Sequence, residues 1–358
     1  MAEQHEQADR TIRVLIVDDT RSIRAMIRAM ISRDPRIEVV GEAGDPFEAR
    51  ELIRALDPDV ITLDVEMPGM DGLAFLDRIM RLRPMPVVMV STRTSENSHA
   101  AIRALSLGAV DCVDIAKLRD GAGRGERLID TLLTAAGARP RRYPEPGMRA
   151  TVDPSEAFDW NGKIVVIGAS TGGVDALMTV LSDYPAAGPP TVIAQHMPAA
   201  FLESFTARLD RLARPCVMPA RDGLRLAPGM VCVAPGGDSH VALSPRDPMR
   251  IKAIPSDGTE PYVPSVNVLF SSAVCHGVNV VGVMLTGMGR DGAEAMGRMR
   301  DQGAHTIAQD AETAVVDGMP RAVRDLGAAC EIAPLHEVGS RILAQTSRRN
   351  RGQGGSAE

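Results

Sequence analysis

The stretch from Lys163 to Gly173, which reads KIVVIGASTGG, constrains the fold of this chain more than any other. Its first five residues are β-prone and nearly all apolar, as a buried parallel strand requires. The strand leads into a glycine-rich turn that contains Ser170, and a helical pattern follows. The spacing of Gly168, Ser170 and Gly172 fits a nucleophile elbow, in which a strand-to-helix turn exposes a serine hydroxyl. It also fits a phosphate-binding turn at a helix N-terminus, so the turn alone leaves both functions open.

Length and composition narrow the class of protein. A chain of 358 residues favours two or three domains, and 44% apolar with 24% charged residues is ordinary for a globular protein. The aromatic content of 3% and the net charge of −6 argue against a nucleic-acid or anionic-membrane binder. No apolar run approaches the roughly 18 residues of a membrane span. The polar N-terminus shows no signal peptide, and five scattered cysteines predict reduced thiols in a cytoplasmic protein.

The first half of the chain alternates short apolar strands with amphipathic helices. This alternation predicts a doubly wound parallel sheet. The expected strands are Arg13–Val17, Ile37–Val40, Val60–Leu63, Val87–Val90 and Ala109–Val113.

Three aspartates follow strands of this expected sheet. Asp18, Asp19 and Asp64 each lie at a strand end, and the carboxyl ends of parallel strands share one edge. An isolated aspartate there is commonly a solvated strand end or a helix cap, but three together favour a hard cation such as Mg²⁺. Ser91, at the end of a neighbouring strand, could donate a hydrogen bond to a phosphoryl oxygen.

Residues 11 to about 118 resemble a response-regulator receiver domain of the flavodoxin-like type, through the motifs IVDD and DVEMPGMDG and the strand end at Ser91. The resemblance implies that Asp64 accepts a phosphoryl group from a histidine kinase. It also implies that Asp18 and Asp19 help to hold Mg²⁺ and that Ser91 is the switch hydroxyl. One position departs from the family, which usually ends its fifth strand with lysine and proline.

Ile115 and Ala116 stand at the positions of that lysine and proline, and Lys117 comes two positions late. Either Lys117 reaches the phosphoryl group through a shifted loop or the lysine contact is missing. Because the family's lysine contacts the phosphoryl group, this departure affects the link between phosphorylation and the change in conformation.

The domain boundaries follow from composition. We expect a receiver domain at residues 11–135, a proline- and charge-rich linker at 136–160, a second domain at 161–347 and a disordered tail at 348–358. The second domain again alternates strands and helices, which predicts a Rossmann-like parallel sheet. Within it, Val241–Leu243 is expected to form a hairpin with the strand at Val231–Ala234.

Ser170, His196 and Asp291 each lie in a loop that leaves a strand and enters a helix. Such loops share one edge of a parallel sheet, so the three side chains can converge. A serine nucleophile needs a base, and the base needs a carboxylate to fix its tautomer. Taken singly, the histidine could be structural and the aspartate an N-cap of the next helix. His240, after a Pro-Gly-Gly turn, is the best candidate for an auxiliary site residue.

The motifs IGASTGG, QHMP, APGG and LTGMGRDGA, within Gly162 to Thr346, resemble the catalytic domain of the chemotaxis protein-glutamate methylesterases, the CheB family. The resemblance implies that Ser170 is the nucleophile, His196 the general base and Asp291 the orienting acid. Met288 and Thr171 would stabilise the oxyanion, and ester hydrolysis would need no cofactor. The implied activity is phosphorylation-regulated hydrolysis of glutamate methyl esters on chemoreceptors, with glutamine deamidation as a second activity.

Two other classes of function remain open. The GASTGG turn could bind a nucleotide in a dehydrogenase-like enzyme, although the next strand ends in Gln195-His196 and not in the acidic residue that would hold a ribose. A DNA-binding response regulator is the other alternative, although no helix-turn-helix or basic stripe is evident.

Overall fold

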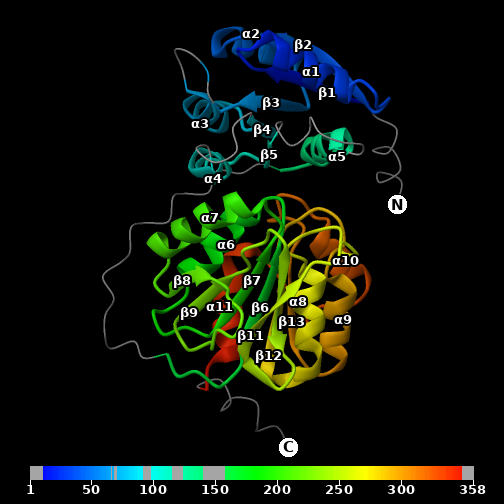
Figure 1. The fold of residues 1–358 in the computed structure, drawn as a ribbon. Helices are drawn as coiled ribbons and strands as arrows, with labels where there is room; N and C mark the ends of the chain where they lie inside the picture. Colours follow the sequence, from blue (N-terminus) through cyan, green and yellow to red (C-terminus); the bar gives the residue numbers. More distant parts are fainter. Residues whose placement is uncertain are drawn as a thin grey trace, which may run out of the picture. The chain divides into compact units, whose positions relative to one another are not determined.

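The computed structural model describes residues 11–65, 67, 71–91, 98–114, 124–139 and 158–348 (Figure 1). The chain divides into two compact units, Met1–Pro144 and Glu145–Glu358. Several expectations lie outside the described residues: the Ile115-Ala116-Lys117 departure, most of the linker and nearly all of the C-terminal tail.

The first unit contains a five-stranded sheet in the order β2-β1-β3-β4-β5, and all its pairs are parallel. Because the strand order reverses beside β1, the connecting helices must cover both faces, which confirms the doubly wound fold. In agreement with this arrangement, α1 packs against α5 and α3 packs against α4. The strands are β1 (Ile12–Val17), β2 (Ile37–Ala43), β3 (Val60–Asp64), β4 (Val87–Ser91) and β5 (Asp111–Asp114), and the helices are α1 (Arg21–Ile31), α2 (Pro46–Leu56), α3 (Gly72–Leu82), α4 (Ser98–Ser106) and α5 (Arg124–Ala136).

The second unit is built on a seven-stranded parallel sheet in the order β14-β13-β12-β6-β7-β9-β8. Every residue of β6, β7 and β12 is buried, because helices cover both faces of the sheet, and this explains their continuous apolar sequences. The Rossmann-like parallel sheet is thus confirmed. The strands are β6 (Ile164–Ala169), β7 (Thr191–Gln195), β8 (Cys216–Pro219), β9 (Met230–Val233), β12 (Val280–Met284), β13 (His305–Gln309) and β14 (Glu331–Ala333).

The helices of the second unit form two layers. On one side α6 packs against α7 and α11, and on the other α8 packs against α9, which in turn contacts α10 (Figure 1). These helices are α6 (Gly173–Ser182), α7 (Ala199–Leu212), α8 (Val266–Ala273), α9 (Ala293–Asp301), α10 (Met319–Asp325) and α11 (Leu335–Thr346). None of the helices in the described ranges is long and apolar enough to cross a membrane.

The expected hairpin between Val231–Ala234 and Val241–Leu243 is wrong. Strand β9 pairs in parallel with β7 on one edge and with β8 on the other, so neither edge is left for a hairpin partner. The segment around Val241 is β10 (Ser239–Ser244), and it pairs in antiparallel with β11 (Asp247–Pro255). Helix α8 packs on β10 and also on β6, where a Cβ atom at Gly168 would overlap Val266. Gly168 therefore lets the N-terminus of α8 approach the central strand.

Candidate active site

Three adjacent strands of the second unit carry the residues singled out in the sequence. Strand β6 lies between β7 and β12, and Ser170, His196 and Asp291 follow these strands at the carboxyl edge of the sheet. Backbone hydrogen bonds join the three strand ends, since the His196 N–H donates to the Ala169 carbonyl at 3.0 Å and the Ser170 N–H to the Thr286 carbonyl at 3.0 Å. The chain turns from one half of the sheet to the other between β6 and β12, which is where open α/β sheets form their clefts.

His196 and Asp291 form a buried pair. Nε2 of His196 lies 2.7 Å from Oδ2 of Asp291, and each side chain is only 6% exposed. Burial alone would raise the pKa of Asp291, but hydrogen bonds from His196 and from two backbone N–H groups outweigh it and hold that pKa below its ordinary value. Asp291 is therefore an ionised acceptor at neutral pH, suited to orient the imidazole ring.

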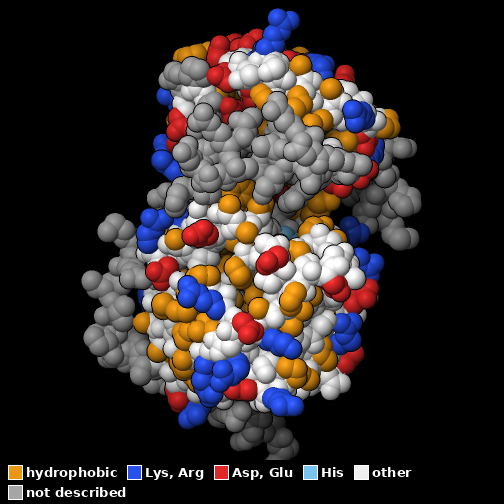
Figure 2. Space-filling model, in the orientation of Figure 1, with side chains coloured by type: hydrophobic (Ala, Val, Ile, Leu, Met, Phe, Trp, Pro, Cys, Tyr) orange, Lys and Arg blue, Asp and Glu red, His pale blue; other side chains and the backbone are white. Residues whose placement is uncertain are grey.

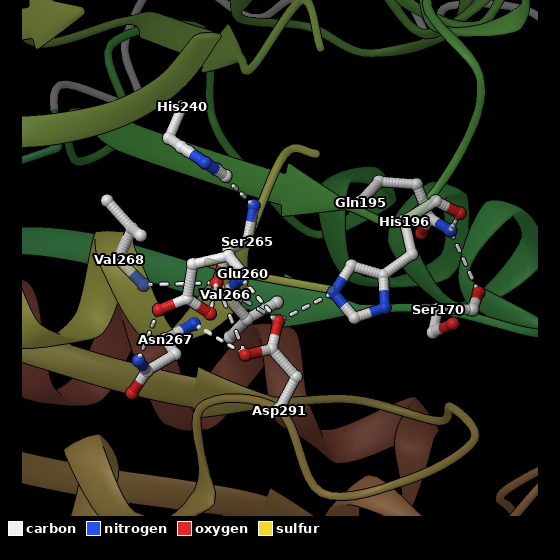
Figure 3. A network of polar contacts seen from close by, with 10 residues as sticks. All are labelled: Ser170, Gln195, His196, His240, Glu260, Ser265, Val266, Asn267, Val268 and Asp291. Carbon is white, nitrogen blue, oxygen red and sulfur yellow. Dashed lines mark hydrogen bonds and ion pairs between the residues drawn. The ribbon is translucent and has the colours of Figure 1, made fainter. Parts of the chain in front are cut away.

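The two backbone donors to Asp291 belong to the N-terminus of α8. The Val266 N–H donates to Oδ2 at 2.7 Å and the Asn267 N–H to Oδ1 at 3.0 Å, while Ser265 Oγ lies 3.3 Å from Oδ1 (Figure 3). A helix N-terminus favours a negative charge through its free N–H groups and its dipole. Asp291 does not cap the helix that follows it, because Gly292 is the N-cap of α9 and no side chain caps that helix.

The other nitrogen of His196 is directed toward Ser170. Within the described residues, Nδ1 is buried and has no hydrogen-bond partner. Figure 3 shows this edge of the ring facing Ser170, with Asp291 on the opposite edge. A buried ring nitrogen without a partner is unusual, since burying a polar group without a hydrogen bond carries a free-energy cost. The arrangement leaves Nδ1 available to accept a proton from the serine side.

Gln195, next to His196, locks the turn that carries Ser170. Its Nε2 donates to the Ser170 carbonyl at 2.8 Å, and the Gly173 N–H donates to the same carbonyl at 2.8 Å. Gly173 leaves space for this side chain, because a Cβ atom there would overlap Gln195 Oε1 and displace it. In the sequence Gln195 stood out only as a non-acidic strand end, and its structural role was missed.

Thr171 and Met288 were expected to provide backbone donors. The carbonyl of the peptide between Ser170 and Thr171 is held by Gln195 and Gly173, as described above. The carbonyl of Gly287 accepts from the N–H groups of Gly318 and Met319 at 3.1 and 2.8 Å. In a trans peptide the C=O and N–H point in opposite directions, so fixing both carbonyls also fixes the directions of the Thr171 and Met288 N–H groups. Both peptides lie beside Ser170, since a Cβ atom at Gly287 would be 2.7 Å from Ser170 Cβ.

A second layer of polar residues supports Asp291. His240 is buried, and its Nδ1 accepts from the Ser265 N–H at 3.1 Å. Glu260 accepts from Ser265 Oγ at 3.1 Å and from Asn267 Nδ2 at 3.0 Å (Figure 3). His240 therefore contacts the site indirectly, through the residue that caps α8. No motif or periodicity marks Glu260 or Ser265, because they lie in a loop and at a helix end and act on Asp291 from there.

Tyr262 also contacts the site and was missed. Its ring stacks on that of His196, with 4.2 Å between the ring centroids and an angle of 13° between the planes. A single exposed tyrosine in a loop carries no periodic signal that would have identified it.

The carboxylates of the first unit also converge. Ligand oxygens of Asp18, Asp19 and Asp64 lie within 4.8 Å of one another at the carboxyl edge of the sheet. Burial, with some help from the charge of Asp19, raises the pKa of Asp18 to about 6, although the Thr20 N–H opposes this effect. Crowded carboxylates of this kind, with oxygen donors only, fit Mg²⁺. Strand β4 pairs with β3, with Asp64 opposite Val90, and ends at Ser91, but the Ser91 side chain lies outside the described atoms.

Figure 2 shows one face of the molecule. On the second unit, acidic and basic side chains are interspersed with hydrophobic ones on this face, and no basic stripe crosses it. The mixed charge gives no support to the DNA-binding alternative.

The two folds define a response regulator with an α/β output unit, in which a serine, a histidine and an aspartate meet at the carboxyl edge of one parallel sheet. Residues 14–116 match the response regulator receiver domain, and residues 165–342 match the CheB methylesterase family. The chain belongs to the CheB family of protein-glutamate methylesterases.

Individual relatives cover almost the whole chain. Protein-glutamate methylesterase/protein-glutamine glutaminase 1 of Caulobacter vibrioides is 49% identical over 343 residues, covering 94% of this chain and 99% of that protein. A protein of the same name from Rhizobium johnstonii is 48% identical and covers 95% of this chain and 98% of its own length. Among solved structures, the Thermotoga maritima CheB methylesterase catalytic domain is 35% identical with a TM-score of 0.49, covering 51% of this chain and 98% of its own.

Proposed function

We propose that this chain hydrolyses glutamate methyl esters on chemoreceptors to glutamate and methanol, under the control of phosphorylation in its first unit. The observation that carries the proposal is the position of His196, which is bonded to Asp291 through one nitrogen and faces Ser170 with the other. Support comes from the relatives, which are named protein-glutamate methylesterases and protein-glutamine glutaminases.

In the proposed reaction, Ser170 is the nucleophile and His196 the general base. Oγ of Ser170 attacks the ester carbonyl carbon while its proton moves to Nδ1 of His196. The tetrahedral intermediate then expels the methoxy group, which takes that proton and leaves as methanol. A water molecule attacks the resulting acyl-enzyme in the same way, its proton passing to Nδ1. Release of glutamate returns the proton to Ser170.

Two backbone N–H groups stabilise the oxyanion of the intermediate. We assign this role to Thr171 and Met288, because the peptide carbonyl on the other side of each is held by two donors. Donors that are fixed before the reaction need no reorganisation when charge develops, and losing one such donor typically costs about 10²–10³ in rate.

Asp291 orients His196 and stabilises the imidazolium that forms. The N-terminus of α8 holds this carboxylate in its ionised state through the N–H groups of Val266 and Asn267. A neutral acceptor at this position would keep the hydrogen bond but lose the charge stabilisation.

The first unit supplies the regulation. We propose that Asp64 accepts a phosphoryl group from a histidine kinase and that Ser91 acts as the switch hydroxyl. Asp18, Asp19 and Asp64 would hold Mg²⁺, which when bound neutralises charge at the phosphoryl group. Gly72 places α3 against this site, because a Cβ atom there would overlap the Asp64 carbonyl.

We further propose the boundaries expected from composition, with the receiver at residues 11–135, the linker at 136–160 and the catalytic domain at 161–347. The division of the chain after Pro144 and the two family matches are compatible with them. We place the protein in the cytoplasm, in agreement with five cysteines that are all free.

Glutamine deamidation is a second candidate activity of the same site. The acyl-enzyme would be identical, and ammonia would leave in place of methanol after taking the proton from His196. The names of the relatives, which include protein-glutamine glutaminase, favour this addition.

Methanol release from methylated receptor membranes, with and without acetyl phosphate as phosphodonor, tests the proposal. We expect release by the full chain and faster release with the phosphodonor and Mg²⁺. Chelation of Mg²⁺ should remove the stimulation and leave the basal rate. Absence of methanol under all these conditions would contradict the esterase assignment.

A further inference from the structure

Tyr262 covers the face of the proposed base. Its ring is stacked on His196 with a 4.2 Å separation of centroids, and the two planes differ by 13°. Tyr262 is itself 39% exposed, whereas the His196 side chain is 6% exposed. An aromatic ring that lies nearly parallel to the imidazole resists its rotation and separates one of its faces from water.

The loop that carries Tyr262 is anchored at two points. It follows β11, where the Ser256 N–H donates to the Asp238 carbonyl at 2.8 Å. Before Tyr262, the carboxylate of Glu260 accepts from Ser265 Oγ and Asn267 Nδ2, as described above. These contacts join the loop to the N-terminus of α8, which also binds Asp291. The same helix end therefore holds both the Tyr262 loop and the Asp291 carboxylate.

Gly236 of the APGG motif allows the loop to pack closely. Its φ of +68° favours glycine, and a Cβ atom there would lie 3.0 Å from Leu202 Cδ1 and 3.3 Å from Pro264 Cδ. The motif therefore has a physical role in this chain. It makes room for the segment that ends the Tyr262 loop.

The hydroxyl end of Tyr262 reaches the loop proposed to stabilise the oxyanion. A Cβ atom at Gly289 would lie 4.0 Å from the Tyr262 hydroxyl oxygen. Tyr262 thus extends from the proposed base to the segment that contains Met288.

We infer that Tyr262 is a positioning residue for the esterase reaction, an inference that rests on the function proposed above. Its ring fixes the plane of His196, so that Nδ1 stays directed at Ser170 while Nε2 stays on Asp291. The negative face of the aromatic ring also stabilises the imidazolium formed during the reaction. Of the charged groups described around His196, Asp291 contacts it directly and Glu260 acts through Ser265 and Asn267.

Two substitutions at Tyr262 distinguish an effect of the aromatic ring from the shielding of His196 by any apolar side chain. Tyr262→Phe keeps the aromatic face and loses only the hydroxyl, so we expect kcat within about twofold of the wild type. Tyr262→Leu keeps an apolar side chain over His196 but removes the aromatic face. We expect kcat to fall about 5- to 30-fold with little change in KM, as a cation–π contact of partly buried groups would give. The acidic limb of the pH–rate profile should move to lower pH.

A receptor-independent readout accompanies these measurements. A fluorophosphonate probe reacts with an activated serine, and the rate at which it labels Ser170 in the full chain reports on His196 without any receptor. We expect slower labelling in Tyr262→Leu and near-normal labelling in Tyr262→Phe. The unfolding temperature of each variant is measured in parallel, and Tyr262→Leu should unfold near the wild-type temperature because the side chain is partly exposed.

The outcomes distinguish the two proposals. Absence of labelling at Ser170 in the wild type would overturn the proposed function and this inference with it. Labelling of the wild type, with equal labelling rate, kcat and pH profile in Tyr262→Leu, would overturn the role of Tyr262 alone. Equal losses in the Phe and Leu variants would also contradict it, because they would assign the effect to the hydroxyl and not to the ring.

Discussion

Nε2 of His196 lies 2.7 Å from Oδ2 of Asp291, although 95 positions of sequence separate the two residues. The contact depends on the adjacency of β7, β6 and β12 in the sheet, and on a helix end that holds the aspartate from its other side. The proposed reaction requires each of these parts.

Ser170→Ala should abolish ester hydrolysis. The substitution removes the only atom proposed to attack the ester and leaves the first unit unchanged, so phosphorylation of Asp64 by acetyl phosphate should proceed normally. Methanol release and a phosphate-affinity gel measure the two activities on the same preparation. Hydrolysis at the wild-type rate by this variant would refute the assignment of the nucleophile.

Asp291→Asn should lower kcat by about 10³–10⁴, because a neutral amide cannot stabilise the imidazolium and its NH₂ group can donate to Nε2, which favours the tautomer with the proton on Nδ1. KM should change little, since Asp291 lies on the edge of the His196 ring opposite Ser170 and away from the proposed ester position. Steady-state kinetics on methylated receptor membranes provide the measurement. A fall of less than tenfold would show that the carboxylate is dispensable.

Gly287→Ala should lower kcat by about 10²–10³ through displacement of the Met288 donor. A Cβ atom at this position would lie 2.7 Å from Ser170 Cβ and 2.5 Å from Met319 Sδ, so the loop or the serine must move. Gly297→Ala is the matched control. Its Cβ atom would meet only Ala328 at 3.6 Å, and the variant should keep full activity. Equal activity of the two variants would argue against the oxyanion loop.

Asp175→Asn should stabilise the second unit at alkaline pH but not at acidic pH. Burial raises the pKa of Asp175 to about 7, although the charge of Arg208 opposes this effect. Between the ordinary pKa of about 4 and this value the folded state binds more protons than the unfolded state, so wild-type stability falls as the pH rises. The variant has no carboxyl to ionise and should gain roughly 2–4 kcal/mol over the wild type at pH 8 and little at pH 4.

Denaturant unfolding of the wild type and of Asp175→Asn at both pH values checks this prediction. A difference between the two proteins that does not change with pH would contradict the raised pKa and assign the effect to packing.

Deletion of residues 1–150 should raise the basal rate of methanol release. A receiver joined by a short linker has a high effective concentration near the catalytic unit, so even a weak inhibitory contact is populated. Residues 145–358 form a compact unit with their own sheet, and the fragment should show cooperative thermal unfolding. Basal activity equal to or below that of the unphosphorylated full chain would count against autoinhibition.

The sequence predicted the parts of the site that depend on strand order. Ser170, His196 and Asp291 each follow an apolar segment, and because parallel strands share an edge, this pattern indicated that the three side chains can converge. The three carboxylates of the first unit were found in the same way, and they do converge.

The parts that the sequence did not reveal act through the backbone or through loops. The donors to Asp291 are N–H groups of Val266 and Asn267, which any residue at a helix start possesses, so no side chain marks them. Tyr262 contacts His196 from an irregular loop without periodicity. The pairing of β10 was predicted wrongly because the sequence does not show that both edges of β9 are already used.

The use of Nε2 for the carboxylate reverses the imidazole orientation of trypsin-like enzymes, in which Nδ1 meets the aspartate. The nitrogen that we propose as the base, Nδ1, is therefore the ring nitrogen closer to the main chain of His196, and Ser170 on the neighbouring strand end faces it. Halomethyl ketones, which alkylate the histidine beside an activated serine, would accordingly leave their carbon on Nδ1, and peptide mass spectrometry with nitrogen-resolved NMR would identify the adduct.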